Sequence, residues 1–496
     1  MTSARSGTSV RVRQHCLTSA VTASSRSNGL LGMRPSKNQT ACEHVANWIY
    51  DTNSPTTGVP RSGGCASDLH RDHPGQGVAG RSVLSEGRNP PGREWNRRQL
   101  LWHAPFLIYW LASLVSSSGT WLHNVTASVV MLGLTGSPML VGVVNAATFL
   151  PLLVFSLPAG ALSDRVDRRL VVVTTQALAL SAAATLTIVT ALQALTPGLL
   201  VISCFAIGTA SAFAKPALSA MLPALVPRQM LPTATALTTL QFNLAQVIGP
   251  AASSVLLFGS SPAWAFGTNA ATFLAPILAM RWMPAGPTRQ HRGTGDAAAS
   301  RRSQAVRQGL RYVASTNPMP LVLLCVALSN AAVEAFRTLA PAIATQALGL
   351  DAAVAGVLIM GRSGGVLLGL TVFDAALRHL GPRRLLLSAF LLQVAGCAGV
   401  SLSDHLSLTV AAGAVMGLGF SFAIPLLSAR LQDLADDEFR ARVMSIYSMA
   451  HLGVRPFYSL LAGGTAALLN VHTAIALAGA TALGGWIVVA RRWSRR

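Results

Sequence analysis

Apolar residues in this chain are gathered into long stretches instead of alternating with polar ones. From Phe106 onward each stretch is about 19 to 28 residues long, enough for a helix to cross a hydrocarbon core of about 30 Å. A spanning backbone must satisfy its own hydrogen bonds, and the alternation typical of barrel strands is missing, so helices are predicted. The pattern predicts twelve spans, at residues 106–133, 139–162, 170–192, 198–222, 234–258, 263–283, 319–345, 353–373, 385–403, 406–429, 443–468 and 471–490.

The connectors between these spans differ in charge, and the difference alternates along the chain. Every second connector, beginning with LTGSP at 134–138, holds no Lys or Arg, whereas the others are rich in arginine. Basic connectors stay on the cytoplasmic side of a membrane, so the alternation predicts an orientation. An even number of spans then places both termini in the cytoplasm.

The two halves of the apolar region are related in sequence. GTASAFAKPALSAMLPAL (208–225) and GLGFSFAIPLLSARLQDL (417–434) align without a gap and share Pro and Ser as well as apolar residues. Such a repeat is typical of secondary transporters. The predicted fold class is an all-α polytopic membrane protein, with twelve transmembrane helices forming two pseudo-symmetric six-helix bundles at 101–283 and 319–496.

Two polar regions lie outside these bundles. Residues 284–318 form a cytoplasmic linker, in which QAVRQGLRYVAS has one apolar helical face that either lies on the membrane or packs under the bundle. Residues 1–100 are rich in Ser, Arg, Gly and Pro without a sustained period, so this tail is expected to be disordered or to reflect a start codon assigned too far upstream.

Composition agrees with a membrane protein and excludes several other classes. The chain is 51% hydrophobic with a mean hydropathy of +0.48 and a net charge of +21, and beyond the tail its arginines lie mostly between apolar stretches. This distribution favours contact with a lipid bilayer over nucleic acid. The six cysteines include no C-x-x-C pair, neither lysine follows a glycine as in a phosphate-binding loop, and no His-Glu-x-x-His is present. We therefore expect no metal site, no ATP hydrolysis and no enzymatic activity.

A dense group of charges, GALSDRVDRR at 160–169, lies between the second and third spans. We interpret it as a conformational latch on the inner face, in which the glycine permits close helix approach, the acid accepts hydrogen bonds from another helix end, and the arginines hold anionic headgroups. The alternative is an ordinary basic loop that obeys the topology rule. The residues of this predicted latch are Gly160, Asp164, Arg165, Arg168 and Arg169.

The spacing of these residues resembles the signature loop of the major facilitator superfamily, over about Pro105 to Arg492. Three stretches, FNLAQVIGPA (242–251), QGLRYV (308–313) and FRARVMSIYSM (439–449), are similar to the branch that contains bacterial secretion effectors and the enterobactin exporter. The resemblance departs at Asp167, where the superfamily usually has Gly. It implies a monomeric bacterial inner-membrane transporter that works by alternating access, with a proton gradient as its energy source and no cofactor.

Ionisable residues within predicted spans are costly and therefore point to function. The candidates for proton coupling or substrate binding are Glu334, Arg337, Arg362, Lys215, Arg455 and His123. Glu334 is the foremost candidate for coupling, because burial favours its protonated form whereas a nearby arginine favours its ionised form. The alternative is that Glu334 and Arg337, three residues apart on one helix, simply neutralise each other. The resemblance places His123, Lys215 and Glu334 along a central cavity.

With a single acid against several bases, the predicted interior is positive, which favours an anionic or amphipathic small-molecule substrate. Two of these basic residues have alternative interpretations. Lys215 reaches the cytoplasmic surface instead of the substrate, and Arg455 has a structural role only. The branch resemblance implies efflux of a compound such as a siderophore or a drug. A proton-coupled importer and a non-transporting membrane scaffold or sensor with the same fold remain alternatives.

Overall fold

The computed structural model describes residues 103–283 and 308–492, within a compact unit that spans Asn89–Arg496. The side chains of Ser156, Leu157, Ala161, Asp164 and Arg165 are not described. The predicted tail at 1–100 and most of the predicted linker, at 284–307, lie outside the described residues. The described part of the chain is helical, as predicted.

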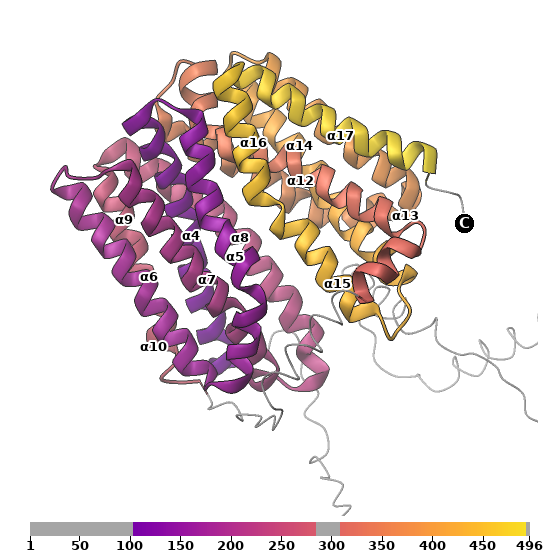
Figure 1. Cartoon of the computed structure of the whole chain (residues 1–496), viewed down its shortest axis with the longest axis horizontal. Helices are drawn as coiled ribbons and strands as arrows, with labels where there is room; N and C mark the ends of the chain where they lie inside the picture. Colours follow the sequence, from indigo (N-terminus) through magenta and orange to yellow (C-terminus); the bar gives the residue numbers. More distant parts are fainter. Residues whose placement is uncertain (1–102, 284–307, 493–496) are drawn as a thin grey trace, which may run out of the picture. The chain divides into compact units, whose positions relative to one another are not determined.

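The described helices fall into two consecutive series (Figure 1). The first consists of α4 (Ala104–Thr135), α5 (Pro138–Arg165), α6 (Arg168–Ala191), α7 (Pro197–Leu225), the short turn η1 (Arg228–Met230), α8 (Leu231–Gly259), α9 (Pro262–Thr272) and α10 (Leu274–Ala279). The second consists of α12 (Met319–Ala342), η2 (Ile343–Ala347), η3 (Ala352–Val354), α13 (Ala355–Leu402), α14 (Leu406–Leu434), α15 (Arg440–Ser448), η4 (Met449–Gly453), α16 (Arg455–Leu468) and α17 (Val471–Arg492).

The arginine-free connectors supply the local chemistry that ends one helix and begins the next. Gly136 adopts the left-handed conformation, with φ 62°, and its N–H bonds the carbonyl of Leu132 at the end of α4. Proline stands in the first turn of α5, α7 and α9, where its missing N–H removes no helical hydrogen bond. Thr196 and Ser261 cap α7 and α9 by accepting hydrogen bonds from backbone N–H groups.

Among the described residues, eight helical stretches are long and apolar enough to cross a membrane. The difference from the twelve predicted spans has identifiable causes. The spans predicted at 353–373 and 385–403 are joined in α13, where Gly381 interrupts the helix with φ 71° and ψ 164°. The span at 263–283 is divided between α9 and α10, and that at 443–468 contains the π-helical turn η4. Helix α4 is continuous but carries the polar run from Ser116 to Asn124.

The two series of helices pack against each other mainly where α5 meets α16 and where α8 meets α13. At the first, a Cβ atom on Gly142 would collide with the carbonyl of Ser459, and one on Gly463 with the carbonyl of Pro138. The backbones can approach this closely only because both positions are glycine. Beside the second, the Ser254 hydroxyl of α8 donates to the carbonyl of Ala353 in η3, the turn that precedes α13.

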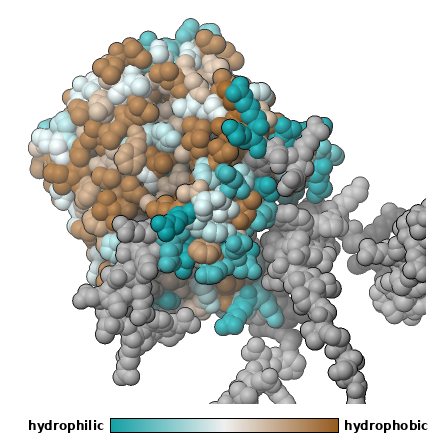
Figure 2. All heavy atoms as spheres, turned by 45° about the vertical axis from the view of Figure 1, so that its right-hand side comes forward, coloured by the Kyte–Doolittle hydropathy of each residue, from teal (hydrophilic) through white to brown (hydrophobic). Residues whose placement is uncertain are grey.

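Apolar side chains lie both inside and outside the helical unit. The largest buried apolar cluster is built mainly by α12, α13, α14 and α17 and includes Phe336 and Phe390. Other large apolar residues face outward, such as Val255 and Trp264, which are 70% and 68% exposed. Figure 2 shows this apolar surface spread across one face, with hydrophilic residues gathered toward one side. Such outward-facing apolar surface is typical of a multi-pass membrane protein.

Candidate polar site between α5, α12 and α16

Helix α12 is the most enclosed helix of the site, and its second half carries the charged residues. Every residue from Ser329 to Ala342 is buried. This helix contacts α5, α13, α14, α16 and α17, so residues on all its faces meet protein. A charged side chain on such a helix needs partners supplied by the surrounding helices.

Glu334 and Arg337 form a buried ion pair on α12. They stand three residues apart, which places both side chains on the same side of the helix. The Nε atom of Arg337 donates to Oε2 of Glu334 at 3.2 Å, and Nη2 donates to Oε1. This two-point contact holds the guanidinium and the carboxylate in one fixed orientation.

Neighbouring helices complete the hydrogen bonding of this pair. From α5, Asn145 accepts from Nη1 of Arg337 at 2.8 Å, and its amide nitrogen donates to Ser128 of α4 at 3.0 Å. From α16, the Ser459 hydroxyl donates to Oε1 of Glu334 at 2.9 Å. The network therefore joins both series of helices, because α4 and α5 belong to the first and α12 and α16 to the second.

Arg455, the first residue of α16, joins this group through an aromatic ring. The guanidinium carbon of Arg337 lies 4.7 Å from the centroid of the Phe149 ring and that of Arg455 lies 5.5 Å from it, so one ring receives two cations. Arg455 also interacts electrostatically with Glu334. Its Nε atom is buried without a hydrogen-bond partner among the described residues.

Arg362 of α13 is a third guanidinium within electrostatic range of this group, interacting with Arg337, Arg455 and Glu334. Its side chain is buried, and Nη2 donates to Ser363 at 2.8 Å and to Gln246 of α8 at 3.4 Å. Within the described part of the chain, its Nε atom has no hydrogen-bond partner. Among the described residues, one carboxylate thus pairs with one guanidinium group and lies within electrostatic range of two more. A low-dielectric site with this imbalance attracts an anion.

Lys215 and His123 are placed differently. Lys215 of α7 is exposed and lies within electrostatic range of Arg455. His123 of α4 is fully buried, and its Nε2 atom lies 3.4 Å from the Cys204 sulfur while its ring packs at 5.5 Å from that of Phe266. The contacts of His123 therefore lie with α7 and α9, inside the first series of helices.

The predicted latch residues lie at the α5–α6 connection. The side chains of Asp164 and Arg165 are outside the described ones. Arg168 donates to the carbonyl of Ala220 on α7 at 2.8 Å, so it ties two helices of the same series. A Cβ atom on Gly160 would meet no described atom within 4 Å, so the described residues do not include a close helix approach at this glycine, and its role in a latch stays a prediction.

Several functional contacts were not foreseen from the sequence. Asp167, the departure from the superfamily pattern, caps α6 by accepting from the N–H of Arg169 at 2.9 Å. Phe149 stands four residues after Asn145, a spacing that places both on one face of α5 and so gave a usable signal. No local pattern marked Ser459 or Gln246, because their roles arise only when α16 and α8 pack beside the charged helices.

Repeated apolar helices over the described residues, with a buried charged network between two series of helices, define the class of multi-pass membrane transporters. Residues 100–493 match the family described as transmembrane secretion effector. The chain belongs to this family, whose members are transporters of the major facilitator superfamily and not enzymes.

Curated relatives are similar over parts of their length. The macrolide efflux protein A of Streptococcus pyogenes is 27% identical over 31% of this chain and 38% of its own length. The enterobactin exporter EntS of Shigella boydii is 32% identical over 38% of this chain and 46% of its own. The matches thus span less than half of these two relatives. The multidrug efflux pump Tap of Mycolicibacterium fortuitum is 25% identical over 74% of this chain and 90% of its own length.

Solved structures share the fold. The nucleoside transporter NupG has a TM-score of 0.63 at 12% identity, over 79% of this chain and 100% of its own. A crystal structure of a peptide transporter POT has a TM-score of 0.61 at 14% identity, over 80% of this chain and 98% of its own. Identities this low establish a common fold and leave substrate and mechanism to the site itself.

Proposed function

We propose that the protein exports a small anionic or amphipathic metabolite by proton-coupled alternating access. The observation that carries this proposal is the imbalance of charge at the junction of α5, α12 and α16. Among the described residues of the group, Glu334 is the one carboxylate; it pairs with Arg337 and lies within electrostatic range of Arg362 and Arg455. A substrate anion would complete the pairing of these guanidiniums, and a proton on Glu334 would release Arg337 from its partner.

The export direction rests on the relatives. Those named above are a macrolide efflux protein, an enterobactin exporter and a multidrug efflux pump. The positive interior supports the anionic or amphipathic character of the substrate. No cofactor takes part in this mechanism, and a monomer suffices for it, since the charged group is assembled from one chain.

We infer for the whole chain the arrangement predicted from the sequence, with twelve spans in two pseudo-symmetric six-helix bundles and both termini in the cytoplasm. The close contact at Gly142 and Gly463 lies near the connectors 134–138 and 469–472, which contain no arginine. By the positive-inside rule these connectors face outward. The structure then corresponds to a state closed on its outer side, and rocking of the bundles would separate this contact.

Two experiments test these proposals. In a cysteine-free background, a cysteine introduced at Ser261 should react with an impermeant maleimide added outside sealed cells. A cysteine introduced at Gly293 should react with it only from the cytoplasmic side. Reaction of both from the same side would contradict the orientation. Comparative metabolite profiling of cells with and without the protein should show a compound that accumulates inside the deletion strain and is depleted from its medium. Accumulation in the medium of the deletion strain would instead indicate import.

A further inference from the structure

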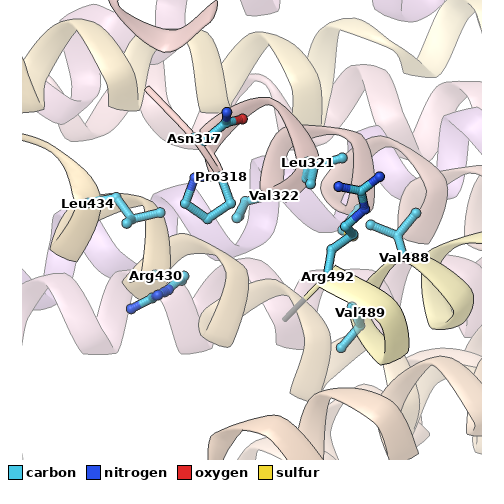
Figure 3. A pocket seen from close by; sticks show the side chains of 10 residues that line it. Asn317, Pro318, Leu321, Val322, Arg430, Leu434, Val488, Val489 and Arg492 are labelled. Carbon is cyan, nitrogen blue, oxygen red and sulfur yellow. The ribbon is translucent and has the colours of Figure 1, made fainter. Parts of the chain in front are cut away.

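Helix α12 adjoins two further groups of polar side chains outside its ion pair. A pocket of about 310 Å³ lies at the start of the helix, where the ends of α14 and α17 meet it (Figure 3). In Figure 3 the arginines of this pocket, Arg430 and Arg492, extend in different directions, so they do not meet on one ligand. The second group does converge, further along α12, where Asn330 meets His451 of the π-helical turn η4.

The hydrogen bonds of Asn330 determine which nitrogen of His451 carries the ring proton. The Asn330 amide nitrogen lies 2.7 Å from the carbonyl oxygen of Val326, which can only accept, and 3.1 Å from Nδ1 of His451. The contact with the carbonyl identifies this nitrogen as the NH₂ group of the amide, which has no lone pair and therefore donates to both partners. Nδ1 of His451 is then the acceptor, and the ring proton is on Nε2.

Two aromatic rings hold the imidazole of His451 in a fixed plane. It packs nearly parallel to Tyr447 of α15 and Phe420 of α14, with interplanar angles of 12° and 23° and ring centroids 5.8 and 6.1 Å away. Its Nδ1 edge is occupied by Asn330 of α12. Within the described part of the chain Nε2 has no hydrogen-bond partner, and His451 is half-buried. An oriented N–H donor is therefore left for a ligand.

This donor lies beside the charged group of the proposed transport site. His451 stands four residues before Arg455, about one helical turn, and lies within its electrostatic range. Lys215 of α7 also lies within electrostatic range of Arg455 and is exposed, although the two residues belong to different series of helices. An exposed side chain so near the other series indicates accessible space between the two series beside Arg455, with His451 next to it.

We propose that His451 is a further substrate-binding residue, whose Nε2–H donates to an uncharged oxygen of the anion that Arg455 attracts. Asn330 is then a positioning residue, because it acts through the tautomer of His451. The inference rests on the proposed function and narrows its substrate class to anions that carry an ether, carbonyl or hydroxyl oxygen about one helical turn from the charge. Such an oxygen accepts a hydrogen bond without a charge of its own.

Binding of two aryl carboxylates to the purified full-length protein tests the proposal. 4-Methoxybenzoate and 4-ethylbenzoate have the same charge and nearly the same shape, but only the first has an ether oxygen that accepts a hydrogen bond. Calorimetric titration gives the ratio of their affinities for each variant without any proton gradient. We expect the preference for the methoxy compound to fall by about 2- to 10-fold from wild type to His451→Phe, which corresponds to the loss of one neutral hydrogen bond.

Two further variants separate a hydrogen bond from packing. His451→Gln places an amide N–H near the position of Nε2 and should keep most of the preference for the methoxy compound. Asn330→Leu removes the group that fixes the tautomer and should lower the preference. Adding His451→Gln to Asn330→Leu should restore it, because an amide donor has no tautomers, whereas a loss of packing alone would not be reversed by the second substitution.

His472, at the start of α17, supplies the matched control. Its Nδ1 lies 2.8 Å from the carbonyl oxygen of Ser401, which can only accept, so this nitrogen carries a proton, the opposite of Nδ1 in His451. His472→Phe should leave the affinity ratio at its wild-type value. Nitrogen NMR of histidine-labelled protein, assigned with the two phenylalanine variants, should show a proton on Nε2 and none on Nδ1 for His451, and a proton on Nδ1 for His472.

Three results would overturn the proposal: an equal affinity ratio in wild type and folded His451→Phe, a protonated Nδ1 on His451, or no binding of either carboxylate by wild type. If His451→Phe does not fold, the loss in Asn330→Leu and its recovery in the double variant decide the question. Failure of the proposed function has a different signature, namely no gradient-driven transport by a protein that still distinguishes the two carboxylates.

Discussion

Replacing Glu334 by glutamine should destabilise the protein more than replacing Arg337 by glutamine. Glu334→Gln keeps the size of the side chain and an acceptor for Ser459, but it leaves three guanidinium groups without a carboxylate. Arg337→Gln, in contrast, leaves a carboxylate that still interacts with Arg362 and Arg455. The two partners of one ion pair are therefore not equivalent.

The size of the effect follows from burial. Removing one partner of a buried pair costs about 3–5 kcal/mol, because the remaining charge is left uncompensated. We expect Glu334→Gln to reach this range and Arg337→Gln to fall below it. The double variant Glu334→Gln, Arg337→Gln should be more stable than the sum of the two changes predicts, since it removes both charges together.

Thermal unfolding of the purified protein in detergent measures these differences. The chain offers a matched control in the pair Asp437 and Arg440, which has the same spacing of three residues and a distance of 2.7 Å but is solvent-exposed. Asp437→Asn should change stability by at most about 1 kcal/mol. Unfolding of Glu334→Gln at the same temperature as Asp437→Asn, or a greater loss of stability in Arg337→Gln than in Glu334→Gln, would contradict this asymmetry of the ion pair.

Three further predictions follow from named contacts. Asn145→Ala, which removes the acceptor for Nη1 of Arg337, should cost about 1.5–3 kcal/mol in thermal unfolding. Asn243→Ala should cost little, because the half-buried Asn243 makes a solvent-exposed hydrogen bond to Thr239 of its own helix α8. Equal effects would argue against the contact between α5 and α12. Asp167→Ala should lower the stability by about 0.5–2 kcal/mol, because it removes the cap of α6. Asp167→Asn should keep most of the wild-type stability. An alanine variant as stable as wild type would exclude the cap. The Tyr312 ring stacks on that of Phe439, with ring centroids 4.3 Å apart, and its hydroxyl donates to Asp436 at 2.9 Å. Tyr312→Ala should therefore increase proteolysis of the neighbouring linker more than Tyr312→Phe. No increase for either variant would contradict this docking.

The sequence predicted the helical class and most helix positions because apolar length and turn chemistry are local properties. LTGSP, QALTP and GSSP contain the proline, glycine and hydroxyl residues that end and begin helices, and the structure places helix boundaries there. The pairing of Glu334 with Arg337 was similarly foreseeable, since a spacing of three residues places both on one face.

What could not be predicted depends on helices that are distant in sequence. Asn145 meets Arg337 across 192 positions and Ser459 meets Glu334 across 125, and neither partner carries a local signal for the other. The role of Asp167 was missed for a different reason. Comparison with the usual glycine at that position drew attention to turn geometry, although aspartate is a favourable residue at a helix N-terminus.

The most direct test of the account is transport driven by an imposed pH gradient. Wild type or Glu334→Gln is reconstituted in proteoliposomes, which are then loaded with the compound identified by metabolite profiling. Asp437→Asn serves as the exposed control. Wild type and the control should both show gradient-driven movement, and Glu334→Gln should lose the gradient dependence although that variant is inserted and folded. Undiminished gradient-driven movement by folded Glu334→Gln would contradict the proposed role of the carboxylate.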